Sequence, residues 1–562
     1  MTSKPAAQLR EIENLRFRFD NEASLRKQEL LDALASARLE NAAQVLRLHE
    51  WLCFARAYPD DSVLLARVEK MLEGFDQRRD LRKQRKLLAD SGIAGTSIHY
   101  EFYHQMAVWL TDRWPERLRI DWPNCDSADA IEKILPHLGL FNESPALDEQ
   151  PFSAREWLER MKGPAESDAA FLVRRIARLK MDPFLRESFF EDLAVPMIIE
   201  PGPDVPSRTQ AWTRIRPPHF QTSALRHGRP DLATELKRAC PEIQSARPDM
   251  SGEVLDLSRA ALVTRSRDLD AFAFGDERDV RLADCGDGLT IAFIGMVPER
   301  RLMFETVYGY LMLKNGVPLG YGVISALFHS VEVAFNVYDT FRGVEAGFIF
   351  SRLLTTLRHM FKARTFTLFP YQLGGQGNEE GLASGAWWFY QKLGFKPRDE
   401  DLLKLMDEEL KRMRKNPGHR SKRSVLKKLA SENVYYDVGK QRRDVIGELP
   451  FAAIGTHITA YLAGRFGSRR DRAAAVCGRE AADILGVGRA FRLGADEKLA
   501  WDRWAPLVLI LPGVAEWSRS EKRALAVVIK AKGGRRESDF TLKFDAHTKL
   551  RRSLLRLGAR DI

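Results

Sequence analysis

The sequence predicts an α+β protein with a mixed β-sheet in the centre of the chain, flanked by mostly α-helical N- and C-terminal domains. Three consecutive patterns support this prediction. Residues 331–338 alternate between two faces as a strand does, and residues 346–360 repeat their apolar side chains with a helical period. A second apolar run of strand length follows at 365–371. Strand, helix and strand in this order are typical of a sheet covered by helices.

The length and composition leave room for several domains. The chain has 562 residues, of which 44% are hydrophobic, so it can bury several cores and about three to four domains are expected. We predict an α-helical domain at 1–195, a connector at 196–250, the sheet domain at 251–398, a basic helical segment at 399–443 and a mainly helical C-terminal domain at 444–562.

The N-terminal region has long charged helical patterns at 11–40 and 63–88, and four tryptophans indicate packed helices: Trp109, Trp114, Trp122 and Trp157. Prolines then cluster between positions 196 and 230, which predicts an extended connector without helices. Farther along, a first strand and helix are predicted at 261–264 and 267–274, and another strand at 290–297.

Residues 308–323 read as two strands around an Asn315-Gly316 turn, which is the strongest local signal for a β-hairpin. The next strand, 331–338, presents Val331, Val333, Phe335 and Val337 on one face and Glu332, Ala334, Asn336 and Tyr338 on the other. A turn at 339–343 then leads into the helix. Such a junction directs unpaired backbone N–H groups and the positive end of the helix dipole at one point, which suits a pyrophosphate.

Together with the segment 386–397, which contains Phe389-Tyr390 and Gly394-Phe395, this region resembles the core of the GNAT acyl-coenzyme A N-acyltransferase superfamily. The likeness covers about a quarter of the chain, and its turn motif reads Arg342-Gly343-Val344-Glu345-Ala346-Gly347. The resemblance implies an acyl-coenzyme A co-substrate, with acetyl-coenzyme A as the expected donor. It also implies donor contacts at Val337, Arg342, Gly343, Val344, Ala346 and Gly347.

Glu345 departs from this motif, because it stands where the first motif glycine is expected. A carboxylate in a first helical turn favours the helix by a few tenths of a kcal/mol up to ~1 kcal/mol. It would nevertheless repel a bound pyrophosphate unless its side chain points outward. Glu345 is therefore the main argument for the alternative that the module binds without catalysing transfer.

In this superfamily an amine attacks the thioester directly, which needs a base for the amine and an acid for the departing thiolate. Glu332 is the candidate base, because it lies on the polar face of the strand that ends at the turn. Its alternative is an exposed glutamate without a role. Tyr390 is the candidate acid by its place in the motif, and its alternative is packing against Trp387, Trp388 and Phe389. The glycine-rich loop 373–381 is either a lid over the acceptor or a flexible insertion.

Basic residues concentrate at 404–428, and the formal net charge of the chain is +11. An acidic partner at this segment is electrostatically reasonable. Specific recognition of nucleic acid is the less favoured alternative, because no zinc finger, RRM signature or convincing helix-turn-helix accompanies the charge. No metal is expected either, since His99 and His104 lack the spacing of a helical metal pair.

Several features indicate a cytoplasmic protein. The N-terminus is polar, without the apolar segment of a secretory signal, and no apolar run is long enough to span a membrane. Five scattered cysteines favour reduced thiols. In the C-terminal domain we predict a helix at 472–485 and a strand at 507–511.

The predicted function is transfer of an acyl group to an amine, carried by a small molecule or by a protein. The sequence leaves the acceptor and the acyl chain open. The alternative is a non-catalytic interaction protein that keeps a GNAT-like module and binds an acidic partner or nucleic acid.

Overall fold

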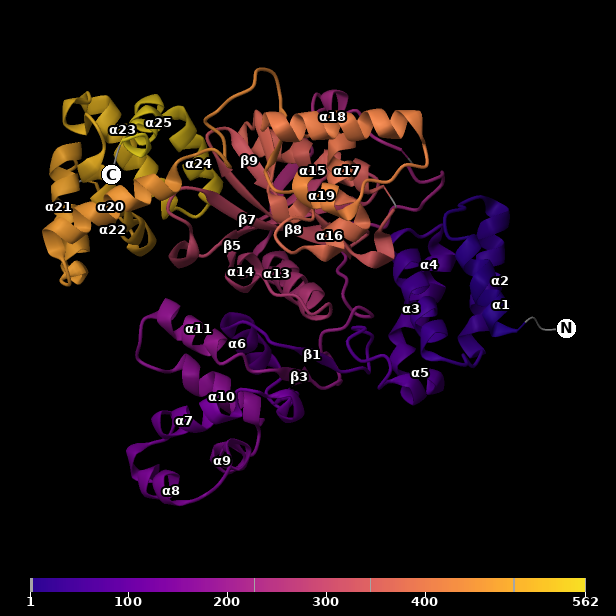
Figure 1. Cartoon of the computed structure of the whole chain (residues 1–562). Coiled ribbons are helices and arrows are strands. Elements are labelled where there is room, and N and C mark those ends of the chain that lie inside the picture. The colour runs from indigo at the N-terminus through magenta and orange to yellow at the C-terminus, as the bar shows by residue number, and fades with distance from the viewer. Residues whose placement is uncertain (1–3, 227, 344, 489–490, 561–562) are drawn as a thin grey trace. The chain divides into compact units, whose positions relative to one another are not determined.

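The fold is described from a computed structural model, which covers residues 4–226, 228–343, 345–488 and 491–560 (Figure 1). Helices account for 54% of the residues and strands for 12%, and most of the strands belong to one large mixed sheet. The predicted α+β class is therefore confirmed. Among the described residues, no helix is both long and apolar enough to cross a membrane.

The chain forms two compact units that do not follow the predicted domain boundaries. The first comprises residues 1–225, 252–274 and 313–319, and the second comprises residues 226–251, 275–312 and 320–562. Residues 252–274 thus belong to the N-terminal unit, although the sequence places them in the sheet domain.

Two hydrophobic cores are formed by described residues of the first unit. One lies among α1 (Pro5–Asn14), α2 (Asn21–Ser36), α3 (Ala42–Ala57), α4 (Ser62–Glu73) and α5 (Arg79–Gln84). The other includes Trp109 and Trp157, as the tryptophan pattern predicts, and combines helices with a small antiparallel sheet of order β1-β3-β2. Its elements are β1 (Ile98–Tyr100), α6 (His104–Arg113), β2 (Leu118–Ile120), α7 (Ala128–Leu138), α8 (Ser144–Glu149), α9 (Ala154–Met161), α10 (Asp168–Ala177), α11 (Pro183–Asp192) and β3 (Met197–Ile199).

One prediction for residues 196–274 is confirmed and one is wrong. The described residues between 196 and 230 contain strand β3 but no helix, as predicted, and a short helix α12 (Leu232–Glu235) and a strand β4 (Glu242–Ser245) follow. Helix α12 forms because the Asp231 carboxylate accepts hydrogen bonds from the N–H groups of its first turn. The strand predicted at 261–264 is the end of helix α13 (Pro248–Val263), followed by α14 (Asp270–Ala273), because a short apolar run alone cannot distinguish a strand from a buried helical turn.

The large sheet has the strand order β12-β13-β11-β9-β8-β7-β6-β5-β4, with β10 paired to β8 beside this path. Strands β9 and β11 run parallel, and β13 pairs antiparallel with β11. Because β13 is a sheet strand, the predicted domain end at residue 398 is too early. The strands are β5 (Gly275–Asp284), β6 (Leu289–Met296), β7 (Thr306–Lys314), β8 (Val317–Leu327), β9 (Ser330–Val333), β10 (Asn336–Val337), β11 (Thr365–Leu368), β12 (Lys396–Pro397) and β13 (Val434–Asp437).

The predicted hairpin is confirmed as β7 and β8. Asn315 and Gly316 between them have φ angles of 49° and 80°, which is the geometry of a tight hairpin turn. The strand predicted at 331–338 is instead interrupted at Ala334 and Phe335, so that it forms β9 and β10. This interruption positions the candidate site.

Five α-helices lie in the sequence between strands β10 and β13: α15 (Ala346–Phe361), α16 (Glu379–Ser384), α17 (Ala386–Lys392), α18 (Glu400–Lys415) and α19 (Arg423–Leu429). The C-terminal region is helical, as predicted, and packs around its own hydrophobic core. The strand predicted at 507–511 is wrong, because these buried or partly buried residues continue a helix to Ile510. The C-terminal helices are α20 (Phe451–Phe466), α21 (Ala473–Leu485), α22 (Ala495–Ile510), α23 (Arg519–Lys532), α24 (Glu537–Ala546) and α25 (Thr548–Gly558).

Candidate functional site

The candidate site begins where strands β9 and β11 separate. The two strands pair from Ser330 with Thr365 to Glu332 with Thr367, and β10 then pairs with β8. At the interruption the Ala334 carbonyl accepts a hydrogen bond from the Tyr310 hydroxyl at 2.5 Å. The next backbone N–H, that of Phe335, donates to the side-chain amide oxygen of Gln372 at 3.0 Å. The side chain of Gln372, which follows β11, is thus hydrogen-bonded to the backbone that follows β9.

Glu332 and Tyr390 lie on opposite faces of the sheet. Ser330 and Thr367 share the face of Glu332, and their hydroxyls bond the backbone N–H and carbonyl of Ile446. The other face carries Phe366, whose neighbour in β13, Tyr436, begins a chain of ring contacts that passes through Phe395 and Phe350 to Tyr390. The structure therefore does not bring the two predicted residues together on one surface. The pairing of β9 with β11 ends at Glu332 and Thr367, so beyond these residues the two strands are no longer joined.

The electrostatics of Glu332 suit a base. Burial, and then the neighbouring carboxylate of Glu305, raises the pKa of Glu332 to about 7. A carboxyl group with such a pKa can accept a proton near neutral pH, which its ordinary value does not favour.

Tyr390 is buried and packs edge-on against Phe350, with 5.5 Å between the ring centroids. Burial raises the pKa of Tyr390 above its ordinary value, so the phenol holds its proton firmly. This environment fits both interpretations made from the sequence, a proton donor and a packing residue.

The predicted donor-binding turn is held by contacts within the protein. The Arg342 guanidinium donates to the Val337 carbonyl at 3.2 Å and pairs with the carboxylates of Asp339 and Glu380. Gly343 is exposed with a φ of 78°, and Val344 lies outside the described residues.

Glu345 precedes the first residue of α15 and adopts a left-handed conformation with a φ of 46°. Its carboxylate accepts a hydrogen bond from the backbone N–H of Arg226 at 3.2 Å. Ala346 and Gly347 form the start of the helix. A Cβ atom on Gly347 would lie 3.1 Å from Pro230, so the glycine permits close approach of the segment 228–230.

A cavity of about 280 Å³ lies at this helix start. Gly228, Arg229 and Pro230 line it together with Gly347 and residues around α17, namely Ser384, Gly385, Trp388, Phe389, Lys392 and Leu393. The cavity thus combines aromatic walls, two cationic side chains and the positive end of a helix of 16 residues.

No family model, curated protein or solved structure matches this chain. The chemistry of the site must therefore be argued from its geometry.

The cations around the cavity influence one another. Partial burial lowers the pKa of Lys392, and the charges of Arg229 and Arg420 lower it further. Arg420 belongs to the loop after α18, and the neighbouring Ser421 hydroxyl accepts a hydrogen bond from the indole of Trp388 at 3.1 Å. Three cationic side chains therefore gather near one aromatic cavity, an arrangement suited to a phosphorylated ligand with a planar group.

Sequence reasoning missed Arg229, Lys392, Gln372 and Trp388 as members of this region. Lys392 lies inside the aromatic motif, two residues after Tyr390, and could have been considered as a phosphate contact. Arg229 gave no such signal, because it belongs to the proline-rich stretch interpreted as a connector. In the parts of the chain that the structure describes, no group of three or more His, Cys, Asp or Glu side chains could hold a metal ion.

Proposed function

We propose that the chain is a GNAT-type N-acyltransferase that moves an acyl group, acetyl in the simplest case, from coenzyme A to an amine. The observation that carries this proposal is the cavity at the start of α15, with Arg229 and Lys392 in its lining. This cavity was not predicted from the sequence, but it lies at the junction where the sequence motif predicts a pyrophosphate.

The cavity offers surfaces whose chemistry suits two parts of the donor. The pyrophosphate would lie at the N-terminal turn of α15, where the helix dipole and the cations favour negative charge. The aromatic side chains of Trp388 and Phe389 offer an apolar wall for the rest of the cofactor. The pantetheine arm would then extend toward the gap between β10 and β11, where the Phe335 N–H now bonds Gln372.

The opposite placement of Glu332 and Tyr390 suits a reaction at this gap. The amine nitrogen attacks the thioester carbonyl carbon, a C–N bond forms and the C–S bond breaks. Glu332 takes a proton from the nitrogen on one side, and Tyr390 gives a proton to the departing sulfur on the other. The products are an amide and free coenzyme A.

Calorimetry with acetyl-, succinyl- and long-chain acyl-coenzyme A tests donor binding. Lys392→Gln should weaken binding by about three- to tenfold, as loss of one partly screened charge does. Lys396→Gln removes an exposed lysine of the following strand and should leave the affinity unchanged. Absence of heat at millimolar ligand would refute the proposal.

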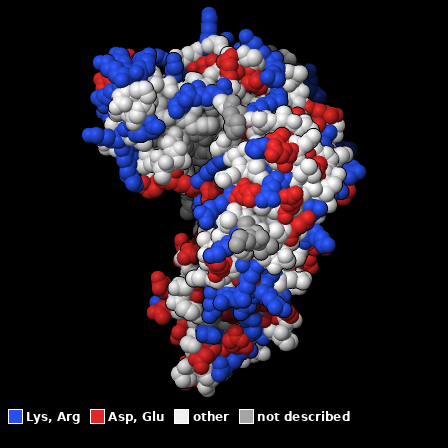
Figure 2. Space-filling model, turned by 90° about the vertical axis from the view of Figure 1, so that its right-hand side faces the viewer, with Lys and Arg blue, Asp and Glu red and all other residues white. Residues whose placement is uncertain are grey.

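The second candidate function is a non-catalytic module that binds an acidic partner through segment 404–428. Exposed cations of this segment form no ion pair with the described residues: Lys411, Arg414, Lys415, Lys422 and Lys428. On the face in Figure 2, Lys and Arg are intermixed with Asp and Glu, which does not favour an extended nucleic-acid surface. Donor binding without transfer to any tested amine would favour this function.

A further inference from the structure

The C-terminal helices contain a second pocket, distinct in residues and chemistry from the site described above. It has a volume of about 340 Å³ and is lined by α21, α22 and described residues between these helices. This volume is at the lower end of the range of small-molecule sites, about 300–1,000 Å³. The lining consists of Ala475, Gly478, Arg479, Ala482, Val487, Gly488, Phe491, Leu493, Lys498 and Trp501.

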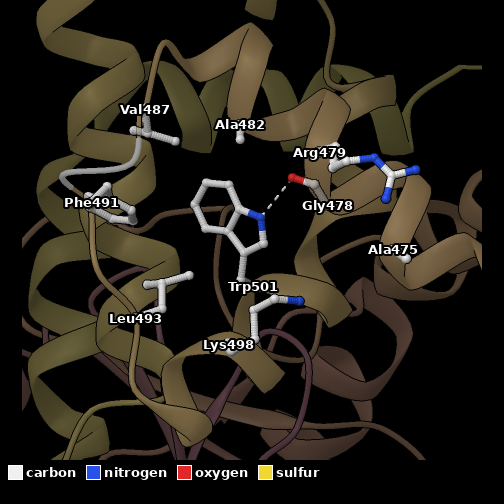
Figure 3. A pocket seen from close by; sticks show the side chains of 10 residues that line it. Ala475, Gly478, Arg479, Ala482, Val487, Phe491, Leu493, Lys498 and Trp501 are labelled. Carbon is white, nitrogen blue, oxygen red and sulfur yellow. Dashed lines mark hydrogen bonds between the residues drawn. The ribbon is translucent and has the colours of Figure 1, made fainter.

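The inner wall of the pocket is aromatic and aliphatic. Trp501 is buried, and its ring centroid lies 5.8 Å from that of Phe491. The indole N–H donates to the Gly478 carbonyl at 3.0 Å, so this polar group is satisfied within the protein (Figure 3). The indole therefore offers the pocket an apolar surface, which Leu493 and Val487 extend.

The polar groups of the pocket are arranged on one side. Figure 3 shows Phe491, Val487 and Leu493 to one side of the Trp501 ring, with Arg479 and Lys498 to the other. Lys498 pairs with Asp502 at 2.5 Å, so its charge is matched. Arg479 is exposed and forms no ion pair with the described residues, and none of the described lining residues is acidic. The described lining residues and their ion-pair partner Asp502 therefore carry about one net positive charge beside an apolar surface.

We infer that this pocket binds a small monocarboxylate with a flat apolar body. The body would lie against Trp501 and Phe491, and the carboxylate would accept hydrogen bonds from the Arg479 guanidinium, whose planar geometry matches it. A single net charge favours a monoanion over a polyphosphate. The occupant is thus chemically different from the donor proposed for the cavity at α15.

A calorimetric titration of the full-length protein with 2-naphthoate tests this inference. The neutral isostere 2-naphthamide provides a comparison that depends on no variant. Naphthoate should bind about three- to tenfold more tightly than the amide, as expected of one half-exposed ion pair. Equal affinities, or no heat from naphthoate at millimolar concentration, would overturn the inference.

Three variants locate the site. Arg479→Gln should remove the preference for the carboxylate, and Ala482→Leu, which adds carbon atoms to the pocket wall, should weaken both ligands. Arg472→Gln removes an exposed arginine just before α21 that does not line the pocket, and it should change neither affinity. Thermal melting verifies that each variant is folded. Unchanged binding in folded Ala482→Leu would place the ligand elsewhere and overturn the inference, whereas failure of coenzyme A to bind would not affect it.

Discussion

The carboxylate of Glu345 accepts a hydrogen bond from the backbone N–H of Arg226, with 3.2 Å between oxygen and nitrogen. The residue that departs from the sequence motif thus has a structural partner, in a segment that also contributes to the cavity wall. Its negative charge nevertheless remains at the positive end of α15.

Glu345→Gln is expected to tighten coenzyme A binding, because the amide oxygen can still accept from Arg226 while the negative charge is removed. The gain should be on the order of 1 kcal/mol, or about fivefold in Kd measured by calorimetry. Glu400→Gln, an exposed glutamate in the first turn of α18, controls for net charge. Unchanged affinity in Glu345→Gln would mean that the carboxylate does not face the phosphates.

Tyr390→Phe should lower kcat by ~10²-fold and leave donor affinity nearly unchanged, as loss of a general acid does. The ring packing against Phe350 is retained in this variant, so the hydroxyl alone is tested. Tyr436→Phe is a matched control from the same aromatic face and should keep full activity. Full activity in Tyr390→Phe would assign the residue to packing.

The pKa of Glu332, about 7, predicts the pH dependence of transfer. Only the carboxylate is a base, so kcat/KM should rise with pH up to about 7. This rise should be absent in Glu332→Gln. Glu305→Gln removes the neighbouring like charge, which should lower the pKa of Glu332 and shift the limb to lower pH. A pH profile that is identical in all three proteins would exclude Glu332 as the base.

Asp545 of α24 holds the turn between β8 and β9. Its two carboxylate oxygens accept the backbone N–H groups of Phe328 at 2.7 Å and His329 at 2.8 Å, and both residues have positive φ angles. Asp545→Asn replaces one acceptor by a donor and should lower the free energy of unfolding by about 1–3 kcal/mol in urea denaturation. Asp483→Asn, at an exposed position of α21, should change it little. Equal stability of the two variants would show that the turn does not need Asp545.

Periodicity and turn chemistry were sufficient to predict the central elements. The Asn315-Gly316 turn, the strand at 290–297 and the long helix after the motif are confirmed because their signals are local. The strands at 261–264 and 507–511 are wrong for one shared reason. In both places a few apolar residues are buried by tertiary packing in a helix, and short apolar runs do not distinguish the two structures.

The candidate site could be predicted only in part. The motif predicted the start of α15. The contribution of Arg229 to the cavity could not be predicted, because Arg229 is distant from α15 in the sequence and only the tertiary fold brings it there. The break between β9 and β10 was also missed, since the alternation of residues 331–338 continues through it. Likewise, no local signal shows that Glu332 and Tyr390 lie on opposite faces, because this depends on which helices cover each face.

The position of β13 has a consequence for synthesis of the chain. Strand β11 pairs with β13, although α16 to α19 lie between the two strands in the sequence. The ribosome therefore releases Leu368 long before Val434. During that interval one edge of β11 exposes unpaired backbone groups, which are prone to pair with other chains. A nascent chain that ends at residue 398 would therefore present an open, aggregation-prone sheet edge at β11.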